Sequence, residues 1–269
     1  MSMRLHVFKT LWGFNGSFTQ AAQMALEAGF DGLEGPVPDS PKAVESLGKV
    51  LEENNLQYIA EICTGGSYVP DRSANPAKHL SDLERKLSDT GALRPQFCNV
   101  MAGCDAWPVP VQYDFFSAAI EIGTRFGVTL SFETHRSRSL FNPWITLELI
   151  RRLPELRLTA DISHWIVVAE RLLGETEDWD TVLSVAEQVH HVHGRVGYPQ
   201  GPQVPHPAAP EYADCLAFHQ RFWEAVWSSQ KRRGFDESTL TPEFGPDRYL
   251  HTLPFTDQPI ADLWEINRW

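Results

Sequence analysis

Apolar residues along the chain follow two alternating patterns. Short stretches rich in β-branched and aromatic residues alternate with longer stretches in which apolar residues recur every three or four positions. The short stretches predict eight strands, at residues 5–9, 32–35, 57–63, 96–102, 128–134, 157–161, 189–193 and 239–243. The longer stretches predict eight helices, at about residues 17–30, 41–54, 77–92, 112–126, 143–152, 180–188, 212–233 and 259–268. Strands and helices are therefore expected to alternate from end to end.

Several of the predicted helices have recognisable ends. Ser17 is placed to cap the first helix, and Asn142 followed by Pro143 is typical of an N-cap and first helical residue. Gly234 follows a run of basic residues and is typical of a helix stop. These signals support the division of the chain into repeated strand–helix units.

Eight strand–helix units predict a closed (β/α)8 TIM barrel that forms one domain over residues 1–269. An open doubly wound sheet usually has fewer strands. The segment after the first strand, residues 9–16, contains glycines but lacks the G-x-G-x-x-G spacing of a dinucleotide-binding turn. The barrel is therefore the favoured fold.

Charge and hydropathy narrow the classes of partner. The chain carries 23 Lys and Arg against 35 Asp and Glu, a formal charge of −12, so nucleic acid is a disfavoured partner. No apolar run approaches the roughly 18–20 residues that cross a membrane, and no secretion signal is visible. The four sparse cysteines, Cys63, Cys98, Cys104 and Cys215, are interpreted as free thiols. We expect a soluble, cytoplasmic protein.

Four consecutive predicted strands end in a carboxylate or an imidazole: Glu133, Asp161, His193 and Glu243. Reacting groups of such barrels lie at the carboxyl ends of the strands, so these side chains are expected to converge. Burying three carboxylates together is costly unless a cation neutralises them. We therefore predict one divalent metal ion, first of all Mn²⁺, with Mg²⁺, Co²⁺ or Zn²⁺ as alternatives. Such an ion can stabilise an enediolate formed by removal of a proton beside a carbonyl.

The sequence motifs around these residues carry a family resemblance. They read Phe-Glu133-Thr-His135, Asp161-Ile-Ser-His164, His-Val-His193 and Pro-Glu243. In this order the motifs resemble the xylose isomerase-like superfamily, which contains sugar isomerases and epimerases, inosose dehydratases and the endonuclease IV repair enzymes. The strand rhythm covers nearly the whole chain, whereas the specific matches are confined to about residues 133–243.

Similarity to the tagatose 3-epimerase-like members implies roles for individual residues. It makes Glu133, Asp161, His193 and Glu243 the metal ligands, with the two glutamates also serving as catalytic acid and base. His164 matches the histidine that contacts substrate oxygens. Arg195 lies two residues past the metal histidine, whereas the arginine of that family lies several residues further on.

The endonuclease IV branch fits the sequence poorly. Its trinuclear zinc site needs extra histidines after the second and third strands and an Asp-x-His after the seventh. The third strand here ends Glu61-Ile-Cys-Thr-Gly, and the Asp-x-His is missing from the segment around His206. Together with the acidic composition, this disfavours DNA repair.

Four further residues are candidate substrate contacts: His135, Arg195, Trp12 and Glu61. Trp12 can stack on a sugar face, as can Phe14, but packing explains either aromatic residue equally well. His135 projects to the same side as Glu133 if the strand continues, where it either contacts substrate or supports a ligand.

Two other residues of the predicted barrel have structural interpretations. Glu34, at the end of the second strand, is interpreted as a salt-bridge partner at the rim or as a substrate contact. His191 shares a side with His193, and the favoured interpretation is structural support of that residue.

Residues 195–210 form a proline-rich loop that is longer than an ordinary strand–helix connection. A loop in this place can cover substrate. The alternative is a rigid surface loop that docks on a second copy of the chain in a homo-oligomer. The sequence leaves both open.

The leading functional hypothesis is a metal-dependent isomerase or epimerase that acts on a sugar or keto-sugar by proton transfer through an enediolate. A lyase or dehydratase acting on a keto-sugar or keto-cyclitol would use the same metal and base, because its first step removes the same kind of proton. A barrel without catalytic activity that binds a sugar or a partner protein is the third alternative.

Overall fold

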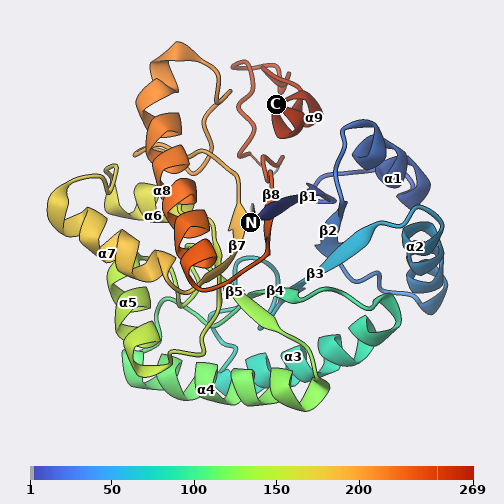
Figure 1. Ribbon diagram of the computed structural model, residues 1–269, viewed down its shortest axis with the longest axis horizontal. Helices are drawn as coiled ribbons and strands as arrows, with labels where there is room; N and C mark the ends of the chain where they lie inside the picture. Colours follow the sequence, from blue (N-terminus) through green and yellow to red (C-terminus); the bar gives the residue numbers. More distant parts are fainter. Residues whose placement is uncertain (1–2, 247) are drawn as a thin grey trace.

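The structure is a computed structural model that describes residues 3–246 and 248–269, and its eight parallel strands close into a barrel in chain order (Figure 1). The strands are β1 (Arg4–Thr10), β2 (Gly32–Pro36), β3 (Gln57–Cys63), β4 (Cys98–Met101), β5 (Leu130–Glu133), β6 (Leu158–Ala160), β7 (Val189–His193) and β8 (Glu237–Thr241). β1 closes the barrel by pairing with both β2 and β8. The predicted single-domain TIM barrel is confirmed.

Helices surround the barrel (Figure 1). They are α1 (Phe18–Glu27), α2 (Pro41–Glu53), α3 (Pro76–Thr90), α4 (Val109–Phe126), α5 (Pro143–Arg152), α6 (Ser163–Ala169), α7 (Thr176–Ala186), α8 (Ala213–Arg232) and α9 (Leu263–Arg268), with short 3₁₀ turns η1 (Gly91–Leu93) and η2 (Pro210–Tyr212). The predicted caps are present: the Ser17 side chain accepts a hydrogen bond from Gln20 N–H, and Asn142 accepts one from Ile145 N–H.

The sequence-based prediction missed one helix and misplaced the ends of two other elements. The sixth unit contains two helices, and α6 was missed because seven residues are too few to show a helical period. β8 ends at Thr241, so Glu243 lies two residues beyond the strand. α9 begins at Leu263 rather than at residue 259. The last two shifts place Glu243 in the connection between β8 and α9.

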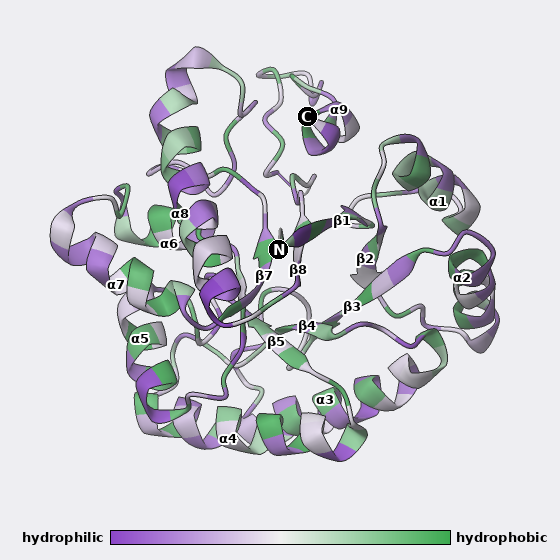
Figure 2. Ribbon diagram, viewed as in Figure 1, coloured by the Kyte–Doolittle hydropathy of each residue, from purple (hydrophilic) through white to green (hydrophobic). Residues whose placement is uncertain are grey.

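The apolar core lies between the strands and the helices. Figure 2 shows hydrophobic and hydrophilic residues alternating along the peripheral helices, as a one-sided core requires. A separate, smaller apolar cluster is formed by Phe8, Ile59 and Phe97, which come from β1, from β3 and from the residue before β4. Towards the carboxyl ends of the strands the buried side chains become polar, among them Glu34, Asn99 and His191. The barrel therefore carries its polar chemistry at one end.

No helix in the two described ranges is long and apolar enough to cross a membrane. The four cysteines are free, and three of them are buried.

The connection after β3 is held by Arg138, whose side chain is fully buried. Its guanidinium donates to the carbonyl oxygens of Thr64, at 2.7 Å, and Tyr68, at 3.0 Å. In the same turn Gly65 has a φ of +64°, and its N–H donates to Asp82 Oδ2 at 3.0 Å. This turn therefore tolerates little change in its backbone.

Replacing Gly65 by alanine should destabilise the fold more than the same change at Gly127, which has nearly the same φ of +66°. A Cβ at Gly65 would lie 2.0 Å from His79 Nε2, whereas a Cβ at Gly127 would meet nothing within 4 Å. Both variants bear the left-handed backbone cost of about 1–2 kcal/mol, and Gly65→Ala should lose a further 1–3 kcal/mol, roughly, from overpacking. Urea unfolding measures both losses, and equal losses would show that His79 does not restrict this turn.

Candidate functional site

Four buried side chains meet at the carboxyl end of the barrel. Glu133 ends β5, Asp161 directly follows β6, His193 ends β7 and Glu243 follows β8. One ligand atom from each residue lies within 4.8 Å of the ligand atoms of the other three. All four residues are at most 5% exposed. The structure thus brings together the residues that the sequence analysis selected as metal ligands, and their role as ligands stays a prediction.

Burial, together with charge repulsion, shifts the pKa values of this group. Burial raises the pKa of Glu133 to about 8, and the negative charge of Glu243 adds to the shift. Burial also raises the pKa of Asp161, although the positive charge of Arg195 opposes it. Burial alone would lower the pKa of His193, but Glu243 and Glu34 hold that pKa well above its ordinary value. Without a cation, the site therefore retains protons to relieve its negative charge.

The side chains present fit a divalent cation. His193 Nδ1 lies 2.9 Å from Glu243 Oε2, yet among the described residues it makes no hydrogen bond of acceptable geometry. A buried nitrogen that faces a carboxylate without a proper hydrogen bond is suited to share a metal with it. Three carboxylates and one imidazole also form the oxygen-rich donor set that hard and borderline divalent ions prefer.

Asn99 on β4 supports this group and was missed by the sequence analysis. Its amide nitrogen donates to Glu133 Oε2 at 3.0 Å and lies 3.5 Å from His193 Nε2. The sequence feature that could have indicated Asn99 is a polar residue within the otherwise apolar run Phe97-Cys-Asn-Val-Met of the predicted fourth strand. A neutral side chain carries little weight in a search for ionisable residues.

Arg195 belongs to the same buried cluster and holds Asp161. Its Nη2 donates to Asp161 Oδ2 and lies 2.7 Å from His164 Nε2, and its Nε donates to Ser163 Oγ at 3.3 Å. Burial would lower the pKa of Arg195, but the negative charge of Asp161 raises it above its ordinary value. The guanidinium therefore stays charged, and its predicted contact with substrate remains a prediction.

His164 and His135 form a pair beside the carboxylates. Their ring centroids are 4.0 Å apart, and both rings lie close to Glu133. Burial lowers the pKa of both residues, helped at His135 by Arg195 and at His164 by the charge of His135. Both imidazoles are therefore neutral at neutral pH. His164 Nδ1 makes no hydrogen bond within the part of the chain that the structure describes, so it can bond to a bound molecule.

An aromatic pair lies next to Arg195. The rings of Trp12 and Tyr249 meet edge to face with centroids 5.2 Å apart, and the Arg195 guanidinium lies 4.8 Å from the Tyr249 ring centre. Phe14 serves a different purpose, because its ring packs against Lys9 Nζ at 4.5 Å. Tyr249 was missed by the sequence analysis because it follows β8 in an irregular segment.

Glu61, on β3, is a carboxyl group whose pKa is raised. Burial raises its pKa well above the ordinary range, and the negative charges of Glu34 and Glu243 raise it further. Its carboxyl group therefore ionises less readily than an ordinary glutamate. Its contact with substrate remains a prediction.

The loop over residues 195–210 is fastened to the segment that carries Glu243. Val196 and Val204 pack in one apolar cluster with Phe244. The side chain of Gln203 donates to the Gly245 carbonyl at 3.2 Å and accepts from the Gly245 N–H at 2.9 Å. The loop is therefore docked within its own chain, beside the candidate site.

Comparison with known proteins gives the family and the fold. The model of the xylose isomerase-like TIM barrel family matches residues 22–201. No curated protein matches the sequence significantly. Among solved structures, the chain is similar to a D-allulose 3-epimerase from Methylomonas sp. solved with D-allulose, with a TM-score of 0.64 and 15% identity over 99% of this chain and 95% of that one.

Two further solved structures have the same sequence identity to this chain. A probable 3-DHS dehydratase from Bacillus anthracis has a TM-score of 0.62 and 15% identity over 91% of this chain and 94% of that one. Endonuclease IV from Thermus thermophilus has a TM-score of 0.57 and 15% identity over the same shares of the two chains. At these identities the similarity shows the fold and leaves the reaction open.

Asp161→Asn should weaken Mn²⁺ binding at least tenfold, roughly, because the ion loses one of its charged ligands. Asp82→Asn is the matched control, since Asp82 is also largely buried but pairs with Lys78 at 2.7 Å on α3. Its Mn²⁺ affinity should stay within twofold of the parent. Electron paramagnetic resonance of free Mn²⁺ measures both affinities. Unchanged binding by Asp161→Asn would remove Asp161 from the ligand set.

Proposed function

We propose that this chain, which belongs to the xylose isomerase-like TIM barrel family, is a divalent-metal-dependent enzyme. Its proposed reaction is the isomerisation or epimerisation of a sugar or keto-sugar by proton transfer. The observation that carries the proposal is the buried group of Glu133, Asp161, His193 and Glu243, whose ligand atoms lie within 4.8 Å of one another. Mn²⁺ is the proposed ion.

The residues that would hold the ion are these four. When bound, a divalent ion supplies the positive charge that acidifies a carbon-bound hydrogen beside a substrate carbonyl. The same charge would offset the burial and the charge repulsion that raise the pKa values of Glu133 and Asp161. Metal binding and the ionisation of these carboxylates are therefore expected to be coupled.

Glu133 and Glu243 are the proposed proton carriers. Glu133 ends β5 and Glu243 follows β8, so they enter the group from different sides of the barrel. A substrate carbon held between them can give its proton to one carboxylate oxygen and receive one from the other, which inverts the carbon. If a single carboxylate returns the proton to the neighbouring carbon, the outcome is aldose–ketose isomerisation.

Neutral histidines and aromatic side chains would bind the rest of the substrate. His164 Nδ1 is available to exchange a hydrogen bond with a substrate hydroxyl, and His135 packs beside it. Trp12 and Tyr249 offer apolar ring surfaces of the kind that cover a sugar face. Arg195 would keep Asp161 oriented and add a charged donor for a substrate oxygen.

Turnover in D₂O should place deuterium on carbon in the product or the recovered substrate, because the proton exchanges on the carboxylate between removal and return. A panel of aldoses, ketoses and keto-sugars with Mn²⁺, followed by NMR, identifies the substrate and makes this measurement. Glu133→Gln and Glu243→Gln should each lower the rate at least ~100-fold, and Glu187→Gln on the surface is the control. Turnover without deuterium and without an isotope effect at that carbon would rule out the proton-transfer mechanism.

His164→Ala should retain Mn²⁺ but lose most of its turnover. His164 Nε2 lies 3.7 Å from Asp161 Oδ2 and 2.7 Å from Arg195, so it is placed beside the ligand group rather than within it. Metal content and rate are measured on the same preparation, and Mn²⁺ affinity is expected to change less than threefold, roughly. A purified variant that no longer binds Mn²⁺ would instead make His164 a ligand.

A further inference from the structure

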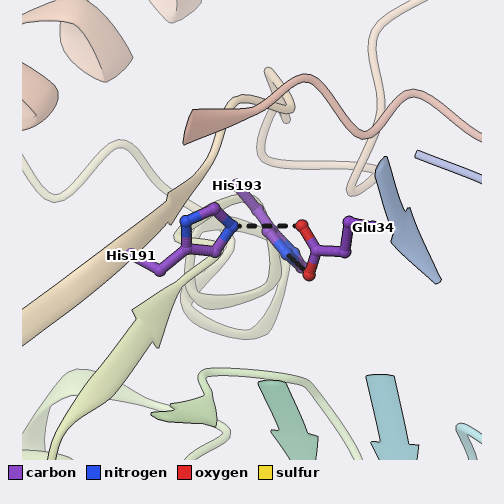
Figure 3. A group of neighbouring side chains, drawn as sticks. All are labelled: Glu34, His191 and His193. Carbon is purple, nitrogen blue, oxygen red and sulfur yellow. Dashed lines mark hydrogen bonds and ion pairs between the residues drawn. The ribbon is translucent and has the colours of Figure 1, made fainter. Parts of the chain in front are cut away.

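Glu34, on β2, bonds to two histidines of β7, one of which is the proposed ligand His193 (Figure 3). Its Oε1 is 3.0 Å from His193 Nε2, and its Oε2 is 3.1 Å from His191 Nε2. The Thr241 hydroxyl donates to the same Oε2 atom. All four side chains are at most 1% exposed, so this is a closed network inside the barrel.

Counting hydrogens fixes the tautomers of this network. An ionised carboxylate only accepts hydrogen bonds, so the Nε2 atoms of His191 and His193 must both carry a hydrogen. A neutral imidazole carries one ring hydrogen, so the Nδ1 lone pair of His191 is free, and that of His193 becomes free once a cation displaces the proton that the neighbouring carboxylates favour on this ring. His191 Nδ1 lies 2.7 Å from Thr239 Oγ1, whose hydroxyl can donate to it. His193 Nδ1 instead faces Glu243 at 2.9 Å.

Glu34 is suited to remain ionised in this place. Its two oxygens are surrounded by potential donors, with His193 Nε2 at Oε1 and both His191 Nε2 and the Thr241 hydroxyl at Oε2, and such hydrogen bonds favour the charged form of a carboxyl group. A charged acceptor also makes a stronger hydrogen bond than a neutral one. Glu34 therefore accepts a hydrogen bond from Nε2 of the His193 ring, whereas Glu243 faces Nδ1 of the same ring.

We propose that Glu34 is a positioning residue for the metal site. It holds His193 as the Nε2–H tautomer and so directs the Nδ1 lone pair of that ring to the ion. His191 and Thr241 hold the other carboxylate oxygen of Glu34 in place. Hydrogen bonding of a ligand histidine to a carboxylate orients the ring and increases its basicity. The inference rests on the proposed metal site. It gives Glu34, on β2, the function of orienting one ligand of that site.

Glu34→Gln tests the assignment, because it keeps the shape of the side chain and removes its charge. The variant should bind Mn²⁺ about 10- to 100-fold more weakly than the parent. Glu187→Gln is the control: Glu187 also accepts a side-chain hydrogen bond, at 3.0 Å from Ser229 Oγ, but this bond joins it to α8 and not to β7. Its affinity should stay within twofold. Equal affinities of the parent and Glu34→Gln would overturn the proposal.

A double-variant cycle separates positioning from general structural support. If Glu34 acts through His193, Glu34→Gln should have little effect once His193 has been replaced, because the ring that Glu34 positions is then absent. Adding Glu34→Gln to His193→Gln should therefore change the remaining Mn²⁺ affinity less than about twofold. A loss as large as in the parent background would mean that Glu34 supports the barrel rather than the ligand.

The tautomer itself can be observed on the unaltered protein loaded with Zn²⁺. Proton–nitrogen NMR of the His193 ring should show a hydrogen on Nε2 and the shift of a metal-bound nitrogen at Nδ1. The reverse assignment would overturn the proposal even if Glu34→Gln failed to fold. A parent protein that binds neither ion would refute the metal site itself, and the role of Glu34 with it.

Discussion

Three carboxylates buried around one imidazole set the main physical constraint on this barrel. Glu133, Asp161 and Glu243 lie too close together, and too far from water, for all three to ionise at low cost. The raised pKa values of Glu133 and Asp161 are the consequence. Such a group is retained in a protein when the missing positive charge comes from something that it binds, and a divalent cation is the simplest such partner.

The rest of the polar interior can be understood as support for that group. From below, the carboxylate of Glu34 holds His193. From β4, Asn99 donates to Glu133, and from the loop after β7, Arg195 holds Asp161. Each proposed ligand except Glu243 is thus oriented by a partner on another strand or loop. The connection that carries Glu243 is fastened to the 195–210 loop through Gly245. Parallel strands closed in chain order bring these distant parts of the sequence to one point.

The sequence was sufficient for the barrel and for the convergence of its four ionisable strand ends, because strand period and the geometry of parallel barrels determine both. The side shared by His191 and His193 followed from strand alternation, and both rings do contact Glu34. What could not be predicted depends on irregular backbone. The bond from Arg195 to Asp161 depends on how the chain leaves β7, and Tyr249 reaches the site from a segment without periodic pattern. Asn99 was overlooked because it is uncharged.

The central claim is that one divalent ion is held by this particular set of four side chains. The most direct measurement is a crystal grown with Mn²⁺ and examined for anomalous scattering at the manganese absorption edge. The account predicts a single strong peak at about 2.0–2.4 Å from an atom of each of Glu133, Asp161, His193 and Glu243. A peak centred instead on Glu133, His135 and His164, the neighbouring group of potential ligands, or no peak at the end of the barrel, would contradict it.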